Sequence, residues 1–310
     1  MNVNDLIRTE IEQRLAPFAV RNQMHHYEVG NPAPNVVALE PWEQVLLGTH
    51  YGTAVLIYRI AATINSNILK NYTKTVSMHR SLSHPNIVRF QGAGWSTGDE
   101  PPELFIATEN TNAGCLQSLL QGDPNSSPPQ PPAPMPYERV VDILRDVASA
   151  MSYLHAQSPP VLHRNLRGSS IHLTHDQTRI GGYSAKVGGF ECSRGLVNDC
   201  MTLMKIPAHF APEIIQGGGD YTTAVDVYSF GILISEMLSK GVVYPRYTAS
   251  NKASSLAMAV VRGHRPTIPS SCPAGLRNLI VRCWDAVPEY RPTFREILDL
   301  LMNNRDSLLV

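Results

Sequence analysis

The sequence predicts an α+β fold with two lobes, a small strand-rich lobe followed by a larger helical one. Short apolar or β-branched runs cluster between residues 42 and 109, which is typical of strands. After residue 109, apolar residues recur at intervals of three and four, which is typical of amphipathic helices. The chain has 310 residues, of which 43% are hydrophobic, so it is long enough to bury a sizeable core.

Residues 1–41 are predicted to precede the two lobes as a short helix and a linker. Asn4 can cap the helix. The residues on its apolar face are Ile7, Ile11, Leu15 and Phe18. The helix either docks on its own domain or binds a partner, and docking is favoured because such spacing is common. Residues 21–41 are polar and contain proline, which indicates a linker.

The small lobe, residues 42–109, is predicted to hold four strands and one helix. The strands are predicted at Val45–Gly48, Ala54–Ile60, Val88–Gly94 and Leu104–Glu109. The helix is predicted over Lys70–Ser83. His84-Pro85 ends this helix, because the residue before a proline avoids helical backbone.

The larger lobe, residues 110–304, is predicted to be mainly helical. Its first long helix carries an apolar face formed by Val140, Leu144, Val147, Met151 and Leu154. Further helices are predicted over residues 223–239, 255–263, 274–284 and 293–303. Residues 305–310 are predicted to form a tail.

A proline-rich insertion, residues 122–136, interrupts the larger lobe. Prolines lack an amide donor, so this stretch favours extended polyproline II conformation over a helix or an inner strand. Pro128 and Pro131 have the P-x-x-P spacing that SH3-type domains recognise, which makes residues 128–134 a candidate contact. The nearest basic residue, Arg139, lies beyond the run, which favours a solvated surface insertion.

Composition excludes several classes of protein. The 26 basic and 26 acidic side chains balance, whereas nucleic-acid and membrane-surface proteins need a basic excess. No apolar stretch approaches the length of a membrane span. Five scattered cysteines without a C-x-x-C pair indicate reduced thiols, and therefore a cytoplasmic protein.

A series of short motifs runs through the chain. They are His84–Val88 (HPNIV), His163–Leu166 (HRNL) with Ser170 four residues on, Ala185–Arg194 (AKVGGFECSR), Ala211–Glu213 (APE), Asp226–Gly231 (DVYSFG), Cys283-Trp284 and Arg291–Phe294 (RPTF). Their order and spacing resemble those of protein kinases over residues 42–304, and imply the bilobal kinase fold. The last two motifs resemble those of the tyrosine-kinase-like group, which includes Raf-like kinases.

The resemblance implies structural roles for His163, Arg164, Phe190, Glu213, Asp226 and Arg291. Glu213 and Arg291 would form a buried ion pair. Asp226 would accept hydrogen bonds from backbone amides of the catalytic loop. His163 and Phe190 would join the apolar stack between the lobes, and the arginine of the HRN motif would be the usual contact for an activation-loop phosphate.

The residues that carry out chemistry in kinases are altered. Phosphoryl transfer depends on positioning and charge compensation, by a lysine, Mg²⁺ ligands and a carboxylate base. The base position is Asn165, whose amide cannot accept the substrate's proton. The metal-ligand positions are Ser170 and Gly189, and Arg167 replaces the phosphate-facing lysine. Glu191, two residues after Gly189, is the carboxylate that would have to take over as a metal ligand.

The lysine and glutamate that pair in the small lobe of active kinases are also predicted to be missing. The lysine is expected in Ala61–Asn65, which contains none, and Lys70 falls too close to the predicted helix. Counting back from His84 puts Thr75 at the position of the glutamate.

The predicted nucleotide site is degraded as well. Residues 48–55 (GTHYGTAV) resemble a shortened phosphate-binding loop, in which His50 would block the approach of the backbone to phosphates. His172 stands where an apolar side chain normally forms the floor under adenine. The predicted nucleotide contacts are Gly48, Gly52, Val55, Thr108, Glu109, Thr111 and His172.

These losses predict a pseudokinase, a catalytically inactive scaffold or allosteric regulator whose partners are proteins such as an active kinase. The alternative is an atypical active protein kinase that uses Glu191 as its metal carboxylate. A third reading is an inactive domain that still binds ATP as a structural ligand. Mg²⁺ is not expected to bind, and nucleotide binding would be weak and independent of metal.

Overall fold

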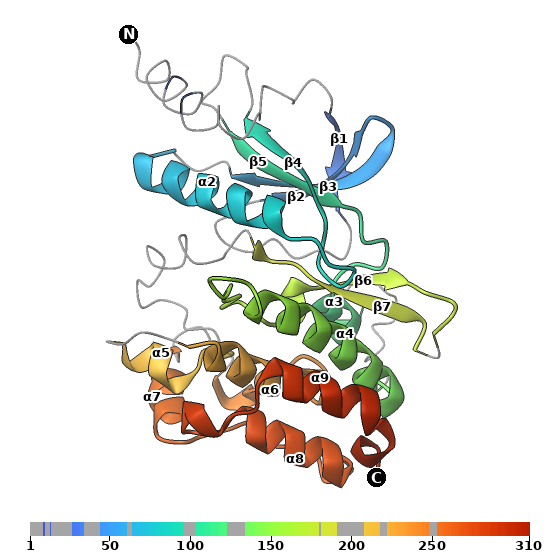
Figure 1. Cartoon of the computed structure of the whole chain (residues 1–310), viewed down its shortest axis with the longest axis vertical. Coiled ribbons are helices and arrows are strands. Elements are labelled where there is room, and N and C mark those ends of the chain that lie inside the picture. Colours follow the sequence, from blue (N-terminus) through green and yellow to red (C-terminus); the bar gives the residue numbers. More distant parts are fainter. Residues whose placement is uncertain are drawn as a thin grey trace.

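A computed structural model shows a strand-rich lobe stacked on a larger helical lobe (Figure 1), so the predicted bilobal α+β fold is confirmed. The structure describes residues 9, 13, 27–33, 44–60, 64–95, 103–122, 134–179, 181–190, 208–217, 222–247 and 253–310. Most of the predicted N-terminal helix and of the proline-rich insertion, together with Glu191, lies outside these described residues.

The small lobe is built on a five-stranded antiparallel sheet with the order β1-β2-β3-β5-β4. Its strands are β1 Tyr27–Pro32, β2 Gln44–His50, β3 Thr53–Ile60, β4 Phe90–Trp95 and β5 Leu104–Glu109. Helix α2, Ser66–Ser81, lies across one face of the sheet (Figure 1). All four predicted strands and the predicted helix are therefore present, with ends shifted by a few residues.

Side chains of β3 alternate between the two faces of the sheet, as the pleat requires. Leu56, Tyr58 and Ile60 share one buried cluster with α2, which contributes Leu69, Tyr72 and Val76. Val55 and Ile57 belong to a second cluster on the opposite face, formed with Leu46, Phe105 and Ala107. Leu47 and Leu56, which pack with the α2-facing cluster, also line the pocket between the lobes, so this alternation decides which residues of β3 can reach that pocket.

Strand β1 corrects the prediction that residues 21–41 are only a linker. Tyr27 pairs with His50 and Val29 pairs with Gly48, which adds β1 to the edge of the sheet. The run YEVGNP lacks a clear alternation of apolar and polar residues and contains Gly30 and Pro32, so it gives no strand signal. An edge strand tolerates proline because one of its sides needs no hydrogen-bond partner in the sheet.

The larger lobe combines helices with a two-stranded sheet (Figure 1). Its helices are α3 Leu116–Gln121, α4 Tyr137–His155, α5 Pro212–Gln216, α6 Ala224–Leu238, α7 Ala253–Val261, α8 Ala274–Cys283 and α9 Phe294–Asn303. The sheet pairs β6, Ile171–His175, with β7, Tyr183–Val187. Short 3-10 turns are η3 Gly168–Ser170, η5 Pro245–Tyr247, η6 Pro288–Tyr290 and η7 Arg305–Leu308.

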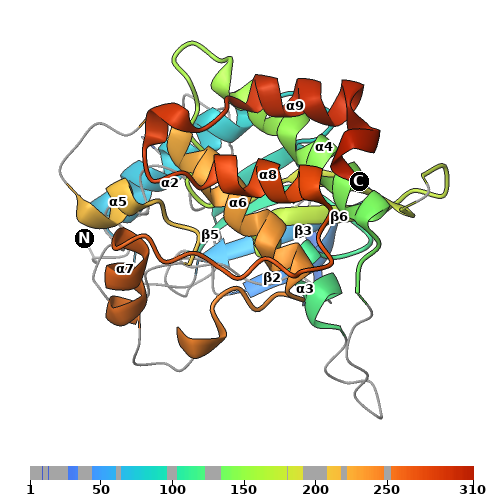
Figure 2. The same ribbon diagram turned by 90° about the horizontal axis from the view of Figure 1, so that it is seen from below.

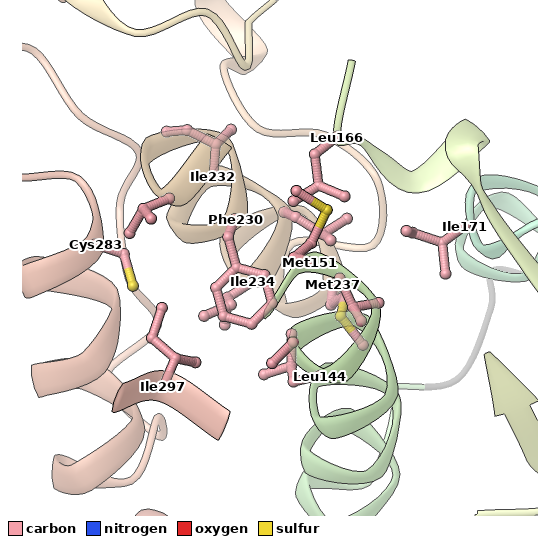
Figure 3. Packing of buried hydrophobic residues seen from close by; sticks show 14 of the residues in the cluster. Leu144, Met151, Leu166, Ile171, Phe230, Ile232, Ile234, Met237, Cys283 and Ile297 are labelled. Carbon is pink, nitrogen blue, oxygen red and sulfur yellow. The ribbon is translucent and has the colours of Figure 1, made fainter. Parts of the chain in front are cut away.

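Helix α6 forms the centre of this lobe, and every residue from Val225 to Met237 is buried. Helix α8 packs against α6 and helix α9 packs against α4, as the view from below shows (Figure 2). Figure 3 shows Phe230 of α6 pointing into the space between Leu144 of α4 and Ile297 of α9. Asp226, which also lies in α6, is therefore held in place by the largest apolar cluster among the described residues.

Residues 305–310 are packed against the lobe, which differs from the predicted tail. Leu308 is buried, and the amide of Gly275 donates to the carbonyl oxygen of Val310 over 3.3 Å. Arg305 forms an ion pair of 3.1 Å with Asp142 of α4. Gly275 permits this approach, because a Cβ at that position would overlap the carbonyl of Ser307.

An ion pair joins the beginning of α5 to the turn before α9. Arg291 Nη1 and Nη2 donate to the two carboxylate oxygens of Glu213 over 2.6 and 3.0 Å. The arginine side chain is 0% exposed, and it also donates to the carbonyl oxygens of Asp285 and Ala224. This is the pair that the resemblance to kinases implied.

Glu213→Ala is expected to lower the free energy of unfolding by about 3 kcal/mol, because it leaves the buried guanidinium without its carboxylate. Urea denaturation measures this quantity. Glu289→Ala, which removes an exposed carboxylate from the neighbouring η6 turn, is the control and should cost less than about 0.5 kcal/mol. Equal effects of the two variants would contradict a structural role for the pair.

Candidate functional site

The loop between α4 and η3, residues 156–167, is held by a buried carboxylate. Asp226 of α6 accepts hydrogen bonds from the backbone amides of His163 (2.9 Å) and Arg164 (2.7 Å). His155 at the end of α4 donates from Nε2 to the same carboxylate over 2.9 Å. Burial alone would raise the pKa of Asp226, but the hydrogen bond and charge of His155, with those of the loop, hold that pKa below its usual value.

Three aromatic rings connect the two lobes next to this loop. The ring of Phe190 lies 5.0 Å from the ring of His79, which belongs to α2, and 5.2 Å from the ring of His163. His163 Nε2 donates to the carbonyl of Gly188 over 2.7 Å, and His79 Nε2 donates to the carbonyl of Val88 over 2.8 Å. Both histidines are buried, so the stack is part of the protein interior.

The structure brings together the predicted catalytic positions. Asn165 and Ser170 both lie against Gly189, and a Cβ added at Gly189 would be 3.5 Å from Asn165 Nδ2 and 2.9 Å from Ser170 Cβ. Ser170 Oγ donates to the carbonyl of Arg167 over 2.8 Å and accepts from the amide of Arg167 over 3.0 Å. The hydroxyl of Ser170 is therefore committed to closing the η3 turn.

These residues do not fit a magnesium ion. Mg²⁺ requires several oxygen ligands in octahedral geometry. Gly189 has no side chain, the Ser170 hydroxyl is already engaged, and Asn165 turns its amide nitrogen toward the position in question. Within the residues that the structure describes, no three His, Cys, Asp or Glu side chains come together as a metal site would need.

Tyr58 lies on β3, the strand that packs on α2. The lysine of active kinases was expected a few residues later in the sequence. β3 ends at Ile60, before the range Ala61–Asn65 in which the lysine was expected, and residues 61–63 lie outside the described part of the chain. Tyr58 is 5% exposed and faces α2, on which Thr75 is also buried. Lys70 lies in α2 and is exposed. Neither the lysine nor the glutamate of active kinases is present on the facing surfaces of β3 and α2.

The predicted phosphate-binding loop is a tight hairpin between β2 and β3. Gly48 pairs with Val55 across the two strands, and Val55 is buried on the face away from α2. Gly52 sits at the exposed tip with φ of +75°, next to Tyr51 with φ of +49°. Consecutive positive φ values are typical of tight hairpin turns. Among the described residues that line the hinge pocket, Gly48, Gly52 and Val55 do not occur, so their contact with a nucleotide stays a prediction.

A pocket of about 440 Å³ opens at the hinge between the lobes. Its wall contains Ala33, Leu47 and Leu56 from the small lobe, Asn110–Gly114 from the hinge, Ser118, Leu119 and Gly122 around α3, and His175 and Tyr183 from the β6–β7 hairpin. Of the predicted nucleotide contacts, Thr111 lines this pocket. None of these lining residues, all of which lie in the described part of the chain, is Lys, Arg, Asp or Glu, so they supply no fixed charge for a triphosphate.

His172 of β6, the residue predicted to lie under adenine, is buried and does not occur among the described residues that line the hinge pocket. Its Nδ1 lies 3.1 Å from the hydroxyl of Thr111, and both residues are buried. Burial lowers the pKa of His172 to about 4, so the imidazole is neutral near pH 7. Thr108 is also buried, and its hydroxyl donates to the carbonyl of Glu109 over 3.3 Å. The hydrogen bond between Thr111 and His172 thus joins the hinge to β6.

Glu109 takes part in an ion pair that sequence analysis did not predict. Lys186 of β7 donates from Nζ to both carboxylate oxygens of Glu109, over 2.8 and 2.9 Å. The amide of Arg89 donates to the same carboxylate over 2.7 Å. The Glu109 side chain is therefore bound to Lys186 and to the backbone of Arg89. The position of Glu109 in the sequence does not reveal these partners.

Fold and site together define a protein kinase-like domain. The family model "Protein tyrosine and serine/threonine kinase" matches residues 35–301, and the chain belongs to this family. In the described part of the chain, no helix is both long enough and apolar enough to span a bilayer.

Several proteins of Dictyostelium discoideum are similar to this chain. A probable serine/threonine-protein kinase is 34% identical over 252 residues, covering 80% of this chain and 22% of the relative. A probable LIM domain-containing serine/threonine-protein kinase is 34% identical over 227 residues, covering 73% and 31%. The dual specificity protein kinase shkA is 31% identical over 242 residues, covering 77% and 42%. The chain thus spans less than half the length of these relatives.

The stability of the protein is expected to fall as the pH drops from 6.5 to about 4. Burial lowers the pKa of His79 and His172 to about 4, so the folded protein resists protonation that the unfolded chain accepts at pH 6.5. The contribution of each neutral histidine to the free energy of unfolding is fully present above pH 6.5. About 3 kcal/mol per histidine is lost as the pH falls to about 4.

Urea titrations of wild type and His79→Leu between pH 7 and 4 test this expectation. The variant should lose about 3 kcal/mol less than wild type over the range, because leucine does not titrate. His264→Gln, at an exposed position, is the control and should leave the pH dependence unchanged. Identical profiles for all three proteins would contradict the buried neutral state of His79.

Proposed function

We propose that this domain is a pseudokinase, which binds and regulates protein partners without transferring phosphate. The main observation behind this proposal is which residues lie at the catalytic centre. Asn165, Ser170 and Gly189 meet there, and none of them supplies the carboxylate that a base or a metal site requires. A kinase that loses its general base alone already loses about 10²- to 10⁴-fold in rate.

The small lobe supports the same proposal. Active kinases hold the nucleotide phosphates with a lysine that is paired to a glutamate of the neighbouring helix. Here Tyr58 and Thr75 are buried on the facing elements β3 and α2, and both are uncharged near pH 7. The triphosphate would therefore meet neither a metal ion nor the cation that normally neutralises it.

Residues that build the architecture are retained, which favours a role in binding over simple decay. Asp226 holds the loop at His163, and Glu213 pairs with Arg291. A domain that keeps its packing while it loses its polar chemistry still presents a defined surface to partners. Kinase-type folds serve functions other than catalysis, because function depends on the site and not on the fold.

Three buried free thiols, Cys115, Cys272 and Cys283, support a reducing cytoplasmic location.

An active enzyme with a relocated metal ligand is the alternative. Glu191 follows Gly189 by two residues, and alternation along an extended chain would aim the Glu191 side chain toward the side on which position 189 faces. The similar Dictyostelium proteins carry names of serine/threonine or dual specificity kinases, which also favours this alternative.

The purified domain is expected to show no phosphoryl transfer at a rate typical of kinases, about 1 s⁻¹ or more. Autophosphorylation and generic-substrate assays with Mg²⁺ or Mn²⁺ measure this. Asn165→Asp, which restores the carboxylate of the base, should remain inactive because the metal and phosphate ligands are still missing. Turnover in the usual range that disappears in Glu191→Gln would contradict the proposal and establish the alternative.

Any nucleotide binding is expected to depend on contacts with the adenine base and to be independent of metal. Adenosine, ADP and ATP should raise the melting temperature by similar amounts, because the lining residues of the hinge pocket carry no fixed charge. Thermal-shift titrations with and without Mg²⁺ measure this. An ATP stabilisation that grows by several degrees on adding Mg²⁺ would show that a working metal site survives.

A further inference from the structure

Acidic side chains are absent from one long stretch of the larger lobe. Residues 237–284 contain no Asp or Glu, although the whole chain has 26 of them. The same stretch holds seven basic residues, which are Lys240, Arg246, Lys252, Arg262, Arg265, Arg277 and Arg282. Because the whole chain is neutral, this stretch is basic and the remainder of the chain carries the matching acidic excess.

The basic stretch forms one end of the larger lobe. It includes the end of α6, η5, α7 and α8, and Figure 2 looks onto this end. Arg246, Met258 and Arg262 are exposed, whereas Lys252 lies outside the described residues. Arg262 follows Met258 by four residues, and its amide donates to the carbonyl of Met258 over 3.1 Å. The two side chains therefore share one face of α7.

Three aromatic rings connect η5 to the turn after α7. The ring of Tyr247 lies 5.9 Å from that of His264. The ring of Tyr244 lies 6.4 Å from that of Tyr247 and 5.7 Å from that of His264. Arg246 directly precedes Tyr247, and Arg262 precedes His264 by two residues. These ring contacts therefore bring the segments that carry the two arginines together.

The turn after α7 is held in place by Arg265. Its guanidinium group lies 5.0 Å from the centre of the Tyr228 ring, which belongs to the buried helix α6. It also donates, each time over 3.0 Å, to the carbonyl oxygens of Val260, His264 and Trp284. The turn is thus shaped by the protein itself, and a surface that is formed before binding lowers the entropic cost of binding.

Acidic side chains on the neighbouring elements are engaged elsewhere. Glu213 of α5, the helix that contacts α7, pairs with Arg291. Glu236 of α6 is buried and accepts a hydrogen bond from the amide of Gly168 over 2.9 Å. Within the part of the chain that the structure describes, Arg262 forms no ion pair with an acidic side chain. Its charge is therefore available to an anionic group of another molecule.

The side chains of this surface favour a protein as the partner. We define the basic face as Arg246, Tyr247, Met258 and Arg262. Arginine, tyrosine and methionine are all enriched in protein–protein interfaces. Met258 is 55% exposed, and the flexible thioether of methionine adapts to apolar groups of different shapes. A nucleic acid or a membrane surface needs a broader excess of positive charge, whereas the remainder of this chain is acidic.

We infer that the basic face binds an acidic segment of a partner protein, in which carboxylates flank an apolar side chain. Arg246 and Arg262 each receive a carboxylate, which a guanidinium group can hold through two parallel hydrogen bonds. Met258 and Tyr247 cover the apolar side chain. This inference rests on the proposed function, in which the domain binds protein partners, and it names the surface and the chemistry of the partner.

Fluorescence anisotropy with a labelled peptide tests the inference on the full chain. The probe is a short peptide that repeats Glu-Glu-Leu, and the matched control peptide repeats Gln-Gln-Leu. The wild-type chain is expected to bind the acidic probe about tenfold more tightly than the control, because charge pairs across an interface discriminate between partners. Equal binding of the two peptides, or no saturable binding of the acidic probe, would overturn the inference.

Charge reversal locates the binding on the surface. Arg246→Glu and Arg262→Glu are each expected to weaken binding of the acidic probe by about tenfold, because each sets a carboxylate against those of the probe. Arg295→Glu, at an exposed position in the first turn of α9, makes the same change in net charge and should alter the affinity by less than about twofold. Equal losses at all three positions would show unspecific attraction and contradict a defined face.

The melting temperature of each variant reports whether it is folded. If a glutamate variant does not fold, the glutamine variant at the same position takes its place. Arg246→Gln and Arg262→Gln remove the charge without reversing it, and each should weaken binding of the acidic probe by about threefold. Unchanged affinity in folded glutamine variants would count against the face as strongly as unchanged affinity after charge reversal.

Met258→Ser tests the apolar part of the contact. Exchanging the leucines of the probe for serine is expected to weaken binding to the wild-type chain. The same exchange should weaken binding to Met258→Ser much less, because residues in contact give non-additive losses. Additive losses would show that the apolar side chain does not meet Met258, and would refute the arrangement inferred for this face.

Single-stranded DNA and vesicles rich in phosphatidylserine separate other polyanions from a protein segment. At about 0.15 M salt, both are expected to bind more weakly than the acidic probe. Tighter binding of either one, if it is lost in Arg262→Glu, would overturn the assignment to a protein partner. Loss of peptide binding leaves the proposed inactivity standing, and phosphoryl transfer would leave the peptide result standing, so the two failures are distinguishable.

Discussion

The buried carboxylate of Asp226 is the constraint on which the rest of the site depends. It lies in α6, the most deeply buried helix, and accepts the amides of His163 and Arg164. The ring of His163 packs against the ring of Phe190, which in turn packs against the ring of His79 in α2. A charge in the interior is tolerable only when hydrogen bonds compensate its desolvation. Loss of this carboxylate would therefore release the loop and the link between the lobes together.

Under the proposed inactivity, this protein keeps the residues that build the kinase fold and loses those that carry out the chemistry, and there is a physical reason for this difference. A residue such as Arg291 cannot be lost cheaply, because its partner Glu213 and the backbone carbonyls around it would remain without a donor. Polar groups of a catalytic centre contribute little to stability and often reduce it. Asn165, Ser170 and Gly189 lie against one another at the centre, and under the proposed inactivity these replacements leave the fold intact.

The fold was predictable because it depends on patterns of apolar spacing and on motifs whose geometry is shared. The positions of Asn165, Ser170 and Gly189 followed from the same motifs. Strand β1 was missed because edge strands pair through the backbone and leave a weak trace in the sequence. That Gly48 and Gly52 belong to the hairpin between β2 and β3 could not be predicted, because spacing does not reveal which two strands a hairpin joins. The roles of His79 and of the ion pair between Lys186 and Glu109 depend on contacts across the lobes, which no local pattern encodes.

We propose that the catalytic centre cannot hold a metal ion together with a nucleotide. Electron paramagnetic resonance of Mn²⁺ measures this directly, because free, ATP-bound and protein-bound Mn²⁺ give different spectra. We predict that adding the protein to Mn²⁺ and ATP leaves the spectrum of the Mn²⁺–ATP complex unchanged at protein concentrations up to equimolar. Stoichiometric conversion to a protein-bound spectrum, absent in Glu191→Gln, would contradict the account.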